Sequence, residues 1–318
     1  MDKKTVSLII PCYNEENNIR FACQEISQVC SKLHHKYEFE ALFVDDGSTD
    51  NTVLEITQLK KKHPNIELIE FSKNFGKEIA TTAGIHNCQG DCCVIIDADM
   101  QYPIEKLPEF LDKWEQGNEV VVGIRDKKKT NNIIEILGSS LFYAISSKIS
   151  SVYIQKGALD YRLIDRKVIN EFKKFTERGR MTRSLIDWLG FKRDYIYYEE
   201  KPRRYGKASY DLLKRFTLAF NTFIVTSLVP LRIAGLLGLL ISSLSLIGGF
   251  VVVLNKYVLE TQWGLSITGS ASVGVFNLFL TGLMLTSLGL IALYIEFIHI
   301  ETLNRPLYVI KNSTKKTS

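Results

Sequence analysis

The sequence predicts an α/β protein with a doubly wound, mostly parallel sheet, interfacial helices and two C-terminal membrane-spanning helices. Two observations lead to this prediction. Through about the first 125 residues, short β-rich runs alternate with segments of helical periodicity, a pattern typical of a parallel sheet with helices on both faces. From Ile233 to Ile295, by contrast, charged residues almost vanish, which indicates a membrane domain.

The expected strands are short and apolar: Val6–Ile10, Phe39–Asp45, Ile66–Phe71, Cys92–Ile96 and Val120–Gly123. Helical segments fall between and after them: Asn18–Leu33, Thr52–Lys62, Lys77–Asn87 and Ile104–Gln116. Between Lys127 and Glu200 the pattern loosens into mixed helix and strand, and the polar stretch Asp126–Asn132 is typical of a flexible loop.

Two apolar runs, Ile233–Leu254 and Val273–Ile295, contain no charged residue. At about 1.5 Å per residue, each run can cross the ~30 Å hydrocarbon core of a bilayer. The alternative, two buried helices of a soluble core, is disfavoured because such helices rarely continue so far without a charge. Before them, Tyr210–Val225 has an apolar face and a polar face, which indicates an interfacial helix or, alternatively, an ordinary amphipathic core helix.

Basic residues are concentrated on one side of the two spans. They precede the first span and follow the second, whereas the connecting stretch Asn255–Ser272 offers only Lys256, balanced by Glu260. The positive-inside rule therefore places both termini and the first half of the chain on the cytoplasmic face of the cell membrane. We expect a catalytic-type domain at 1–208, a juxtamembrane helix at 209–230, a two-span hairpin at 231–298 and a cytoplasmic tail at 299–318. The N-terminus has too short an apolar stretch for a signal peptide.

The net charge of +5 is modest and lies mainly beside the predicted membrane segments. This distribution argues against nucleic acid as a partner and favours anionic lipid headgroups. The six cysteines lack CxxC spacing, and we predict that they are reduced structural residues. The five histidines have no partners at ligand spacing, so we do not expect a histidine metal site.

Polar clusters follow three of the predicted strands, beginning at Pro11, Asp45 and Asp97. Because ligands of such sheets bind outside the carboxyl ends of the strands, these clusters predict one binding crevice. Asp50 is more simply interpreted as a helix cap. Asp97 and Asp99 would repel one another unless a cation or solvent separated them, and their oxygen ligands favour Mg²⁺ or Mn²⁺.

The motifs at these positions resemble those of family 2 glycosyltransferases of the GT-A fold. More narrowly, they are similar to bacterial polyprenyl-phosphate glycosyltransferases, relatives of dolichyl-phosphate mannose synthase that carry two C-terminal spans. The resemblance rests on five segments: Pro11–Glu15, Val44–Asp50, Ser72–Glu78, Asp97–Pro103 and Tyr161–Leu163.

The resemblance implies two sets of residues on the donor side. One set holds the base and ribose of a nucleotide: Pro11, Tyr13, Glu15, Val44 and Asp46. The other meets the diphosphate and its metal: Asp97, Ala98, Asp99 and Gln101, with Asp97 and Asp99 as the metal ligands. Carboxylates can accept hydrogen bonds from ribose hydroxyls, and an aromatic ring such as that of Tyr13 can pack on a base.

On the acceptor side, the resemblance assigns Asp160 and Arg162 to the acceptor phosphate. The family's glycine before this aspartate is Leu159 here, which puts the loop geometry in question. A second motif, beginning at Arg203, departs from the family pattern at its end, and the resemblance then implies that Arg203 and Lys207 supply the cations for the acceptor phosphate. Lys73 and Lys77 are equally well interpreted as solvated lysines or as residues near a phosphate.

These inferences predict inverting transfer of a hexose-type sugar from a nucleotide diphosphate donor, with UDP as the expected carrier, to polyprenyl (undecaprenyl) phosphate. The product would serve the modification of cell-envelope glycans. The catalytic residues are expected to be Asp99, Asp160 and Arg162, and the family resemblance favours a homo-oligomer packed through the spans. Two alternatives stay open: a processive polysaccharide synthase, although no Gln-x-x-Arg-Trp motif is present, and a catalytically silent membrane scaffold.

Overall fold

A computed structural model describes residues 3–126, 157–178, 180–201, a few positions between 236 and 247, and 269–314. The chain divides into two compact units. Met1–Ser209 and Arg305–Ser318 form the first, and Tyr210–Asn304 forms the second. Asp126 apart, the predicted loop at 126–132 lies outside the described residues, as do the helix at 210–225 and most of the first apolar run.

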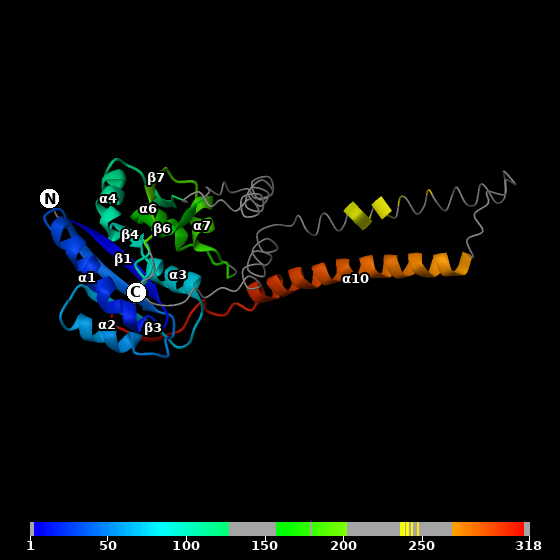
Figure 1. The fold of residues 1–318 in the computed structure, drawn as a ribbon, viewed down its shortest axis with the longest axis horizontal. Helices are drawn as coiled ribbons and strands as arrows, with labels where there is room; N and C mark the ends of the chain where they lie inside the picture. Colours follow the sequence, from blue (N-terminus) through cyan, green and yellow to red (C-terminus); the bar gives the residue numbers. More distant parts are fainter. Residues whose placement is uncertain are drawn as a thin grey trace. The chain divides into compact units, whose positions relative to one another are not determined.

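The first unit is built on one 8-stranded sheet with the strand order β7-β5-β6-β4-β1-β2-β3-β8 (Figure 1). Its strands are β1 (Lys4–Cys12), β2 (Tyr37–Asp45), β3 (Ile66–Phe71), β4 (Cys92–Ile95), β5 (Val120–Arg125), β6 (Ala158–Asp165), β7 (Arg193–Tyr198) and β8 (Ile310–Ser313). Its helices are α1 (Glu16–Leu33), α2 (Thr52–Lys60), α3 (Lys77–Asn87), the 3₁₀ turn η1 (Ile104–Lys106), α4 (Leu107–Glu115), α6 (Arg166–Phe172) and α7 (Thr182–Trp188).

The central strands β4, β1, β2 and β3 are mutually parallel, whereas β6 and β8 run antiparallel to their neighbours. This arrangement confirms the predicted α/β class with a mostly parallel sheet. The five expected strands and four expected helical segments are all present, with the last helical segment divided into η1 and α4.

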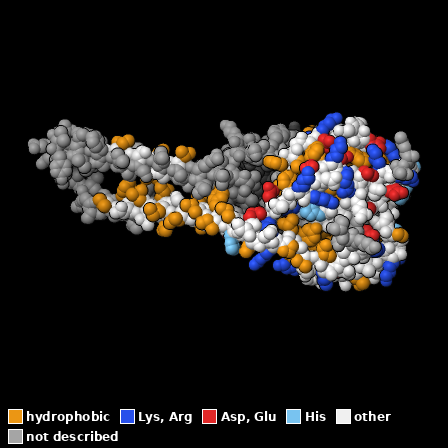
Figure 2. Space-filling model, turned by 180° about the vertical axis from the view of Figure 1, so that it is seen from behind, with side chains coloured by type: hydrophobic (Ala, Val, Ile, Leu, Met, Phe, Trp, Pro, Cys, Tyr) orange, Lys and Arg blue, Asp and Glu red, His pale blue; other side chains and the backbone are white. Residues whose placement is uncertain are grey.

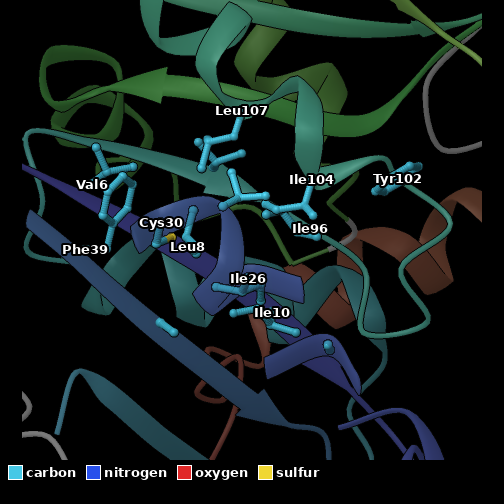
Figure 3. Packing of buried hydrophobic residues seen from close by; sticks show 14 of the residues in the cluster. Val6, Leu8, Ile10, Ile26, Cys30, Phe39, Ile96, Tyr102, Ile104 and Leu107 are labelled. Carbon is cyan, nitrogen blue, oxygen red and sulfur yellow. The ribbon is translucent and has the colours of Figure 1, made fainter. Parts of the chain in front are cut away.

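Alternate side chains of β1 enter two different cores, as the pleat of a strand requires. Leu8 and Ile10 pack with α1, α2 and α4 on one face of the sheet, and Figure 3 shows them beside Ile26 of α1. Ile9 belongs to the other core, against α3, α6 and α7. Helices therefore cover both faces, and the carboxyl ends of the parallel strands are left for the polar clusters. All six cysteines are buried and none forms a disulfide.

β8 is an addition that the sequence pattern did not predict. Residues of the expected tail pair antiparallel with β3, with Ile69 opposite Ser313 and Phe71 opposite Ile310. The ring of Tyr308, just before β8, stacks on Phe71 with centroids 5.1 Å apart. The end of the chain thus closes one edge of the sheet.

The second unit contains α10 (Gly269–Thr302), a helix of 34 residues. Within it, Leu280–Thr302 is long and apolar enough to cross a membrane. The described residues contain one helix of this kind. Large apolar side chains such as Leu285, Leu288 and Ile295 are exposed along it (Figure 2). The predicted run Val273–Ile295 lies inside α10, whereas a two-span hairpin is not shown.

Candidate active site

The three polar clusters meet at one edge of the sheet, as the strand pattern predicts. β1 and β2 end in register, with Pro11 opposite Val44 and Cys12 opposite Asp45. The amide of Asp46 then donates to the carbonyl of Cys12 at 2.9 Å, and the amide of Ile96, just after β4, donates to Ile9 at 2.9 Å. The segments that begin at Tyr13, Asp46 and Asp97 therefore leave neighbouring strands side by side.

The loop after β1 is fastened to the loop after β2. Asn14 has a φ of 54°, in the left-handed region that asparagine tolerates better than most residues. Its amide donates to the hydroxyl of Ser48 at 2.9 Å, and its side-chain oxygen accepts from the amide of Thr49 at 2.9 Å. The amide of Glu15 donates to the hydroxyl of Thr52 at 2.8 Å. These bonds leave the ring of Tyr13 44% exposed, so it is accessible to a base.

Asp46 organises the loop that follows β3. Its carboxylate is 3% exposed and accepts from the amides of Phe75 at 2.7 Å and Gly76 at 2.9 Å. Burial raises the pKa of Asp46, and the hydrogen bonds from Phe75 and Gly76 oppose that rise. Asp46 thereby joins the second polar cluster to the start of α3.

Gly47 is required at its position for two reasons. Its φ is +69°, a conformation that costs an L-residue about 1 kcal/mol or more. A Cβ at this position would lie 2.3 Å from the carbonyl carbon of Lys73. Only glycine allows the loops after β2 and β3 to approach this closely.

The turn after β4 holds the paired carboxylates. Met100 has a φ of 54° and is buried, an uncommon conformation that the surrounding packing must maintain. The amide of Gln101 donates to Oδ1 of Asp99 at 3.2 Å, and the carbonyl of Gln101 accepts from the amide of Lys201 at 3.0 Å. Ala98 is buried beneath the turn, which brings Asp97 and Asp99 to the same edge of the sheet.

Lys77 lies between two carboxylates. Its Nζ is 2.7 Å from Oδ1 and 2.8 Å from Oδ2 of Asp97, and 3.4 Å from Oδ2 of Asp160. Burial acts to lower the pKa of Lys77, but the charges of Asp97 and Asp160 outweigh it and raise this pKa above its ordinary value. Burial also raises the pKa of Asp97, and Lys77 acts in the opposite direction.

A metal would find oxygen ligands here, but not a complete protein cage. Within the described residues, Oδ1 of Asp97 is buried without a hydrogen bond of good geometry, although the Lys77 charge is close to it. No group of three or more His, Cys, Asp or Glu side chains among those residues is arranged to hold an ion. Mg²⁺ commonly binds through one or two carboxylates plus substrate phosphates, and Asp97 with Asp99 fits that ligand set.

Arg162 lies deeper than its predicted role would require. The side chain projects from β6, is 1% exposed, and donates to the two carboxylate oxygens of Asp187 at 2.8 and 3.2 Å. It also donates to the carbonyls of Leu159 and Arg183 at 3.2 and 3.3 Å. Together with Lys77 and Asp160 it lines a small recess. Its guanidinium is therefore already engaged, and a direct contact with a phosphate stays a prediction.

Comparison with known proteins decides the family. The model of glycosyl transferase family 2 matches residues 7–172, which run from within β1 to the end of α6 and include all three polar clusters. This chain belongs to glycosyl transferase family 2. It is a glycosyltransferase by this membership, as the resemblance implied.

Relatives of this family 2 glycosyltransferase match nearly its whole length. The uncharacterized glycosyltransferase YkcC of Bacillus subtilis (strain 168) is 35% identical over 307 residues, covering 96% of this chain and 93% of the relative. The bactoprenol glucosyl transferase of Shigella phage SfV is 32% identical over 311 residues, covering 98% and 99%. A mannosyltransferase from Pyrobaculum calidifontis, solved with GDP-Man and Mn²⁺, is 18% identical, with a TM-score of 0.45 and coverage of 94% and 88%.

The structure thus brings together the residues predicted for the donor side and leaves part of the predicted acceptor side undescribed. The residues at one edge are Pro11, Tyr13, Glu15, Val44, Asp46, Asp97, Ala98, Asp99 and Gln101, with Asp160 reached through Lys77. Arg203 and Lys207 lie outside the described residues.

Two residues of this region were not singled out from the sequence. Asp187 pairs with the buried Arg162, and Glu78 accepts from the amide of Thr182 at 2.8 Å, which joins α3 to α7. Lys77 was left between two interpretations. Its position as the first residue of a helix that follows a glycine was the available signal.

Proposed function

We propose that this family 2 glycosyltransferase transfers a hexose-type sugar from a nucleotide diphosphate, expected to be a UDP-sugar, to polyprenyl phosphate. The observation that carries the proposal is the meeting of the Asp46 loop and the Asp97–Gln101 turn at one sheet edge. The full-length likeness to bactoprenol glucosyl transferases supports the acceptor, because bactoprenol is itself a polyprenol.

On the donor side, the nucleoside would lie over the ends of β1 and β2. The exposed ring of Tyr13 offers a surface for the base, and Glu15 and Asp46 offer acceptors for hydroxyl or N–H groups. The two backbone bonds from Phe75 and Gly76 keep the Asp46 carboxylate in one orientation. A carboxylate held in this way needs little reorganisation when it accepts a hydrogen bond from a nucleotide.

Asp97 and Asp99 would hold Mg²⁺ or Mn²⁺ together with the donor diphosphate. Such an ion neutralises the charge of a departing nucleoside diphosphate. The turn around Met100 keeps the two carboxylates at the same edge of the sheet, and Oδ1 of Asp97, which lies 2.7 Å from the Lys77 ammonium, is suited to a further ligand bond.

The acceptor needs no strong base. A phosphate monoester has a second pKa of about 6 and is largely a dianion at neutral pH, so alignment and charge neutralisation are the main requirements. Asp160 would orient the acceptor, and Arg162 would hold the neighbouring β6 segment or meet the phosphate, with Arg203 and Lys207 contributing cations. A single displacement by the phosphate oxygen at C1 of the sugar inverts the anomeric centre.

The membrane arrangement is part of the proposal. The apolar helix Leu280–Thr302 supports membrane association, and we propose a second span at Ile233–Leu254, an external connecting loop and a cytoplasmic catalytic unit at the cell membrane. A homo-oligomer packed through the spans belongs to the same proposal.

The deciding experiment is mass spectrometry of the lipids formed when the purified full chain in detergent meets undecaprenyl phosphate and a panel of nucleotide sugars. One polyprenyl-phosphate sugar with UDP as co-product is the expected result. Repeated sugar addition would favour a processive synthase, and no product with any donor would favour a silent scaffold. Either result would contradict the proposal.

A further inference from the structure

The ammonium group of Lys77 lies against the carboxylate of Asp97, one of the two proposed metal ligands. Its Nζ lies within 2.8 Å of both oxygens of that carboxylate and 3.4 Å from Asp160. A divalent ion binds carboxylate oxygens at about 2.0–2.2 Å, and two cations cannot share such a position without strong repulsion. The ammonium must therefore leave Asp97 before an ion can bind there.

The backbone of Lys77 cannot move with its ammonium. It is the first residue of α3, whose next turn is anchored by the buried Ala80 and Thr81. The side chain itself is 48% exposed and has four rotatable bonds, so it can turn away while the helix stays fixed. This geometry allows exchange between an ammonium and a metal at the same carboxylate.

We propose that Lys77 is a positioning residue that competes with the divalent cation for Asp97, so that the cation binds well only together with a diphosphate. The inference rests on the proposed function, which supplies the metal and the diphosphate. Without a diphosphate, the displaced ammonium loses contacts with two carboxylates and gains none. When a diphosphate is present, its negative charge compensates both the displaced ammonium and the arriving ion.

The Lys77 ammonium also links Asp97 to Asp160. Asp97 and Asp160 both contact the one Lys77 ammonium, which offsets part of their negative charge and keeps Asp160 near Asp97. Binding of metal and donor are consequently coupled, and such coupling is reciprocal: each ligand raises the affinity of the other by the same factor.

The test is Mn²⁺ binding to the full chain in detergent, measured by electron paramagnetic resonance with and without UDP. Lys77→Met should bind Mn²⁺ without nucleotide about five- to fiftyfold more tightly than the wild type, within the range of typical couplings. The factor by which UDP raises Mn²⁺ affinity should fall correspondingly. Lys77→Arg keeps the competing charge and should stay close to the wild type.

Lys73→Met is the matched control, because it removes the same charge from the loop that leads into α3. The Lys73 ammonium lies over the Phe75 ring, 5.2 Å from its centroid. Its nucleotide-free Mn²⁺ affinity should therefore stay near the wild-type value. Equal Mn²⁺ binding in Lys77→Met and wild type, or weaker binding in the variant, overturns the role of Lys77. Absence of Mn²⁺ binding in every protein even with UDP would instead contradict the metal assignment of the proposed function.

Discussion

Arg162 and Asp187 form a buried ion pair in which two guanidinium nitrogens donate to the two carboxylate oxygens at 2.8 and 3.2 Å. The pair joins β6 to α7, and Arg193 of β7 lies 3.3 Å from the same carboxylate. Arg162, which the motif predicts to meet the acceptor phosphate, is thus also a structural link between β6 and α7.

Replacing Arg162 should therefore affect stability as well as transfer. Removing one partner of a buried pair costs about 3–5 kcal/mol, and the remaining Arg193 places Arg162→Met near the lower end. For a unit of this size, that loss should lower the melting temperature by roughly 6–12 °C. The melting temperature of Arg162→Lys should lie between those of the wild type and Arg162→Met, because lysine keeps the charge but cannot donate to both carboxylate oxygens as arginine does.

Thermal unfolding and UDP affinity should be measured beside the transfer rate. Arg20→Met is a suitable control, since it removes a solvent-screened surface pair with Glu55 and should leave the melting temperature almost unchanged. An unchanged melting temperature with lost transfer would show that Arg162 acts mainly on the substrate.

Gly47→Ala should weaken nucleotide binding. Its new methyl group would displace the Lys73–Asn74 backbone, and with it the Phe75 and Gly76 amides that hold Asp46. We expect a loss of UDP affinity of at least about tenfold, or about 1.4 kcal/mol, by calorimetry. Gly117→Ala provides the same left-handed strain, at a φ of +88° with nothing within 4 Å, and should leave UDP affinity unchanged. Equal affinities in the two variants would refute the steric explanation.

Asp99→Ala should abolish transfer while the protein stays folded, because a partly exposed site carboxylate contributes little to packing. EDTA should have the same effect on the wild type, and Mg²⁺ or Mn²⁺ should reverse it. Asp112→Ala, at an exposed position of α4, is the control and should retain full activity. Full activity in EDTA would remove the metal from the proposed mechanism.

His86 should make the catalytic unit sensitive to acid. Burial lowers the pKa of His86 to about 4, with Arg180 and Lys173 acting in the same direction, and its ring meets Phe172 edge-on. A histidine with an ordinary pKa of about 6.5 when unfolded takes up its proton more readily in the unfolded chain. Its contribution to stability is therefore complete above pH 6.5 and is lost as the pH falls toward 4.

The melting temperature should accordingly drop between pH 7.5 and pH 5, and His86→Phe should reduce that drop. The exposed His35 is the control, and His35→Phe should leave the pH dependence as it is in the wild type. An identical pH dependence in all three proteins would show that other groups govern acid unfolding.

Local patterns predicted the parallel half of the sheet well. In β1, β2 and β3 the residues are mostly apolar or alternate between apolar and polar along the strand. The polar residues that follow these strands converge because parallel strands share one carboxyl edge. The pair Asp97 and Asp99 could be recognised for the same reason.

Interactions between distant segments could not be predicted in this way. β8 is a four-residue strand of sequence IKNS, with no apolar run to mark it, and it forms only because the exposed edge of β3 is available. The partner of Arg162 was equally hidden, because Asp187 is an unremarkable residue of α7 until tertiary packing brings it against β6. The bridging position of Lys77 depends on the placement of Asp160 by the same strand.

The pairing of β3 with β8 also determines when the sheet can be completed during translation. The register joins Ile69 to Ser313, so the ribosome must add more than 240 residues, including all of α10, before this edge of the sheet can close. Domains generally fold from the N-terminus during translation, at about 5–20 residues per second. The sheet of the first unit therefore keeps one strand edge unpaired for at least roughly ten seconds while the intervening residues are synthesised. β8 can pair only after α10 has been synthesised, so the sheet of the first unit is completed late in translation.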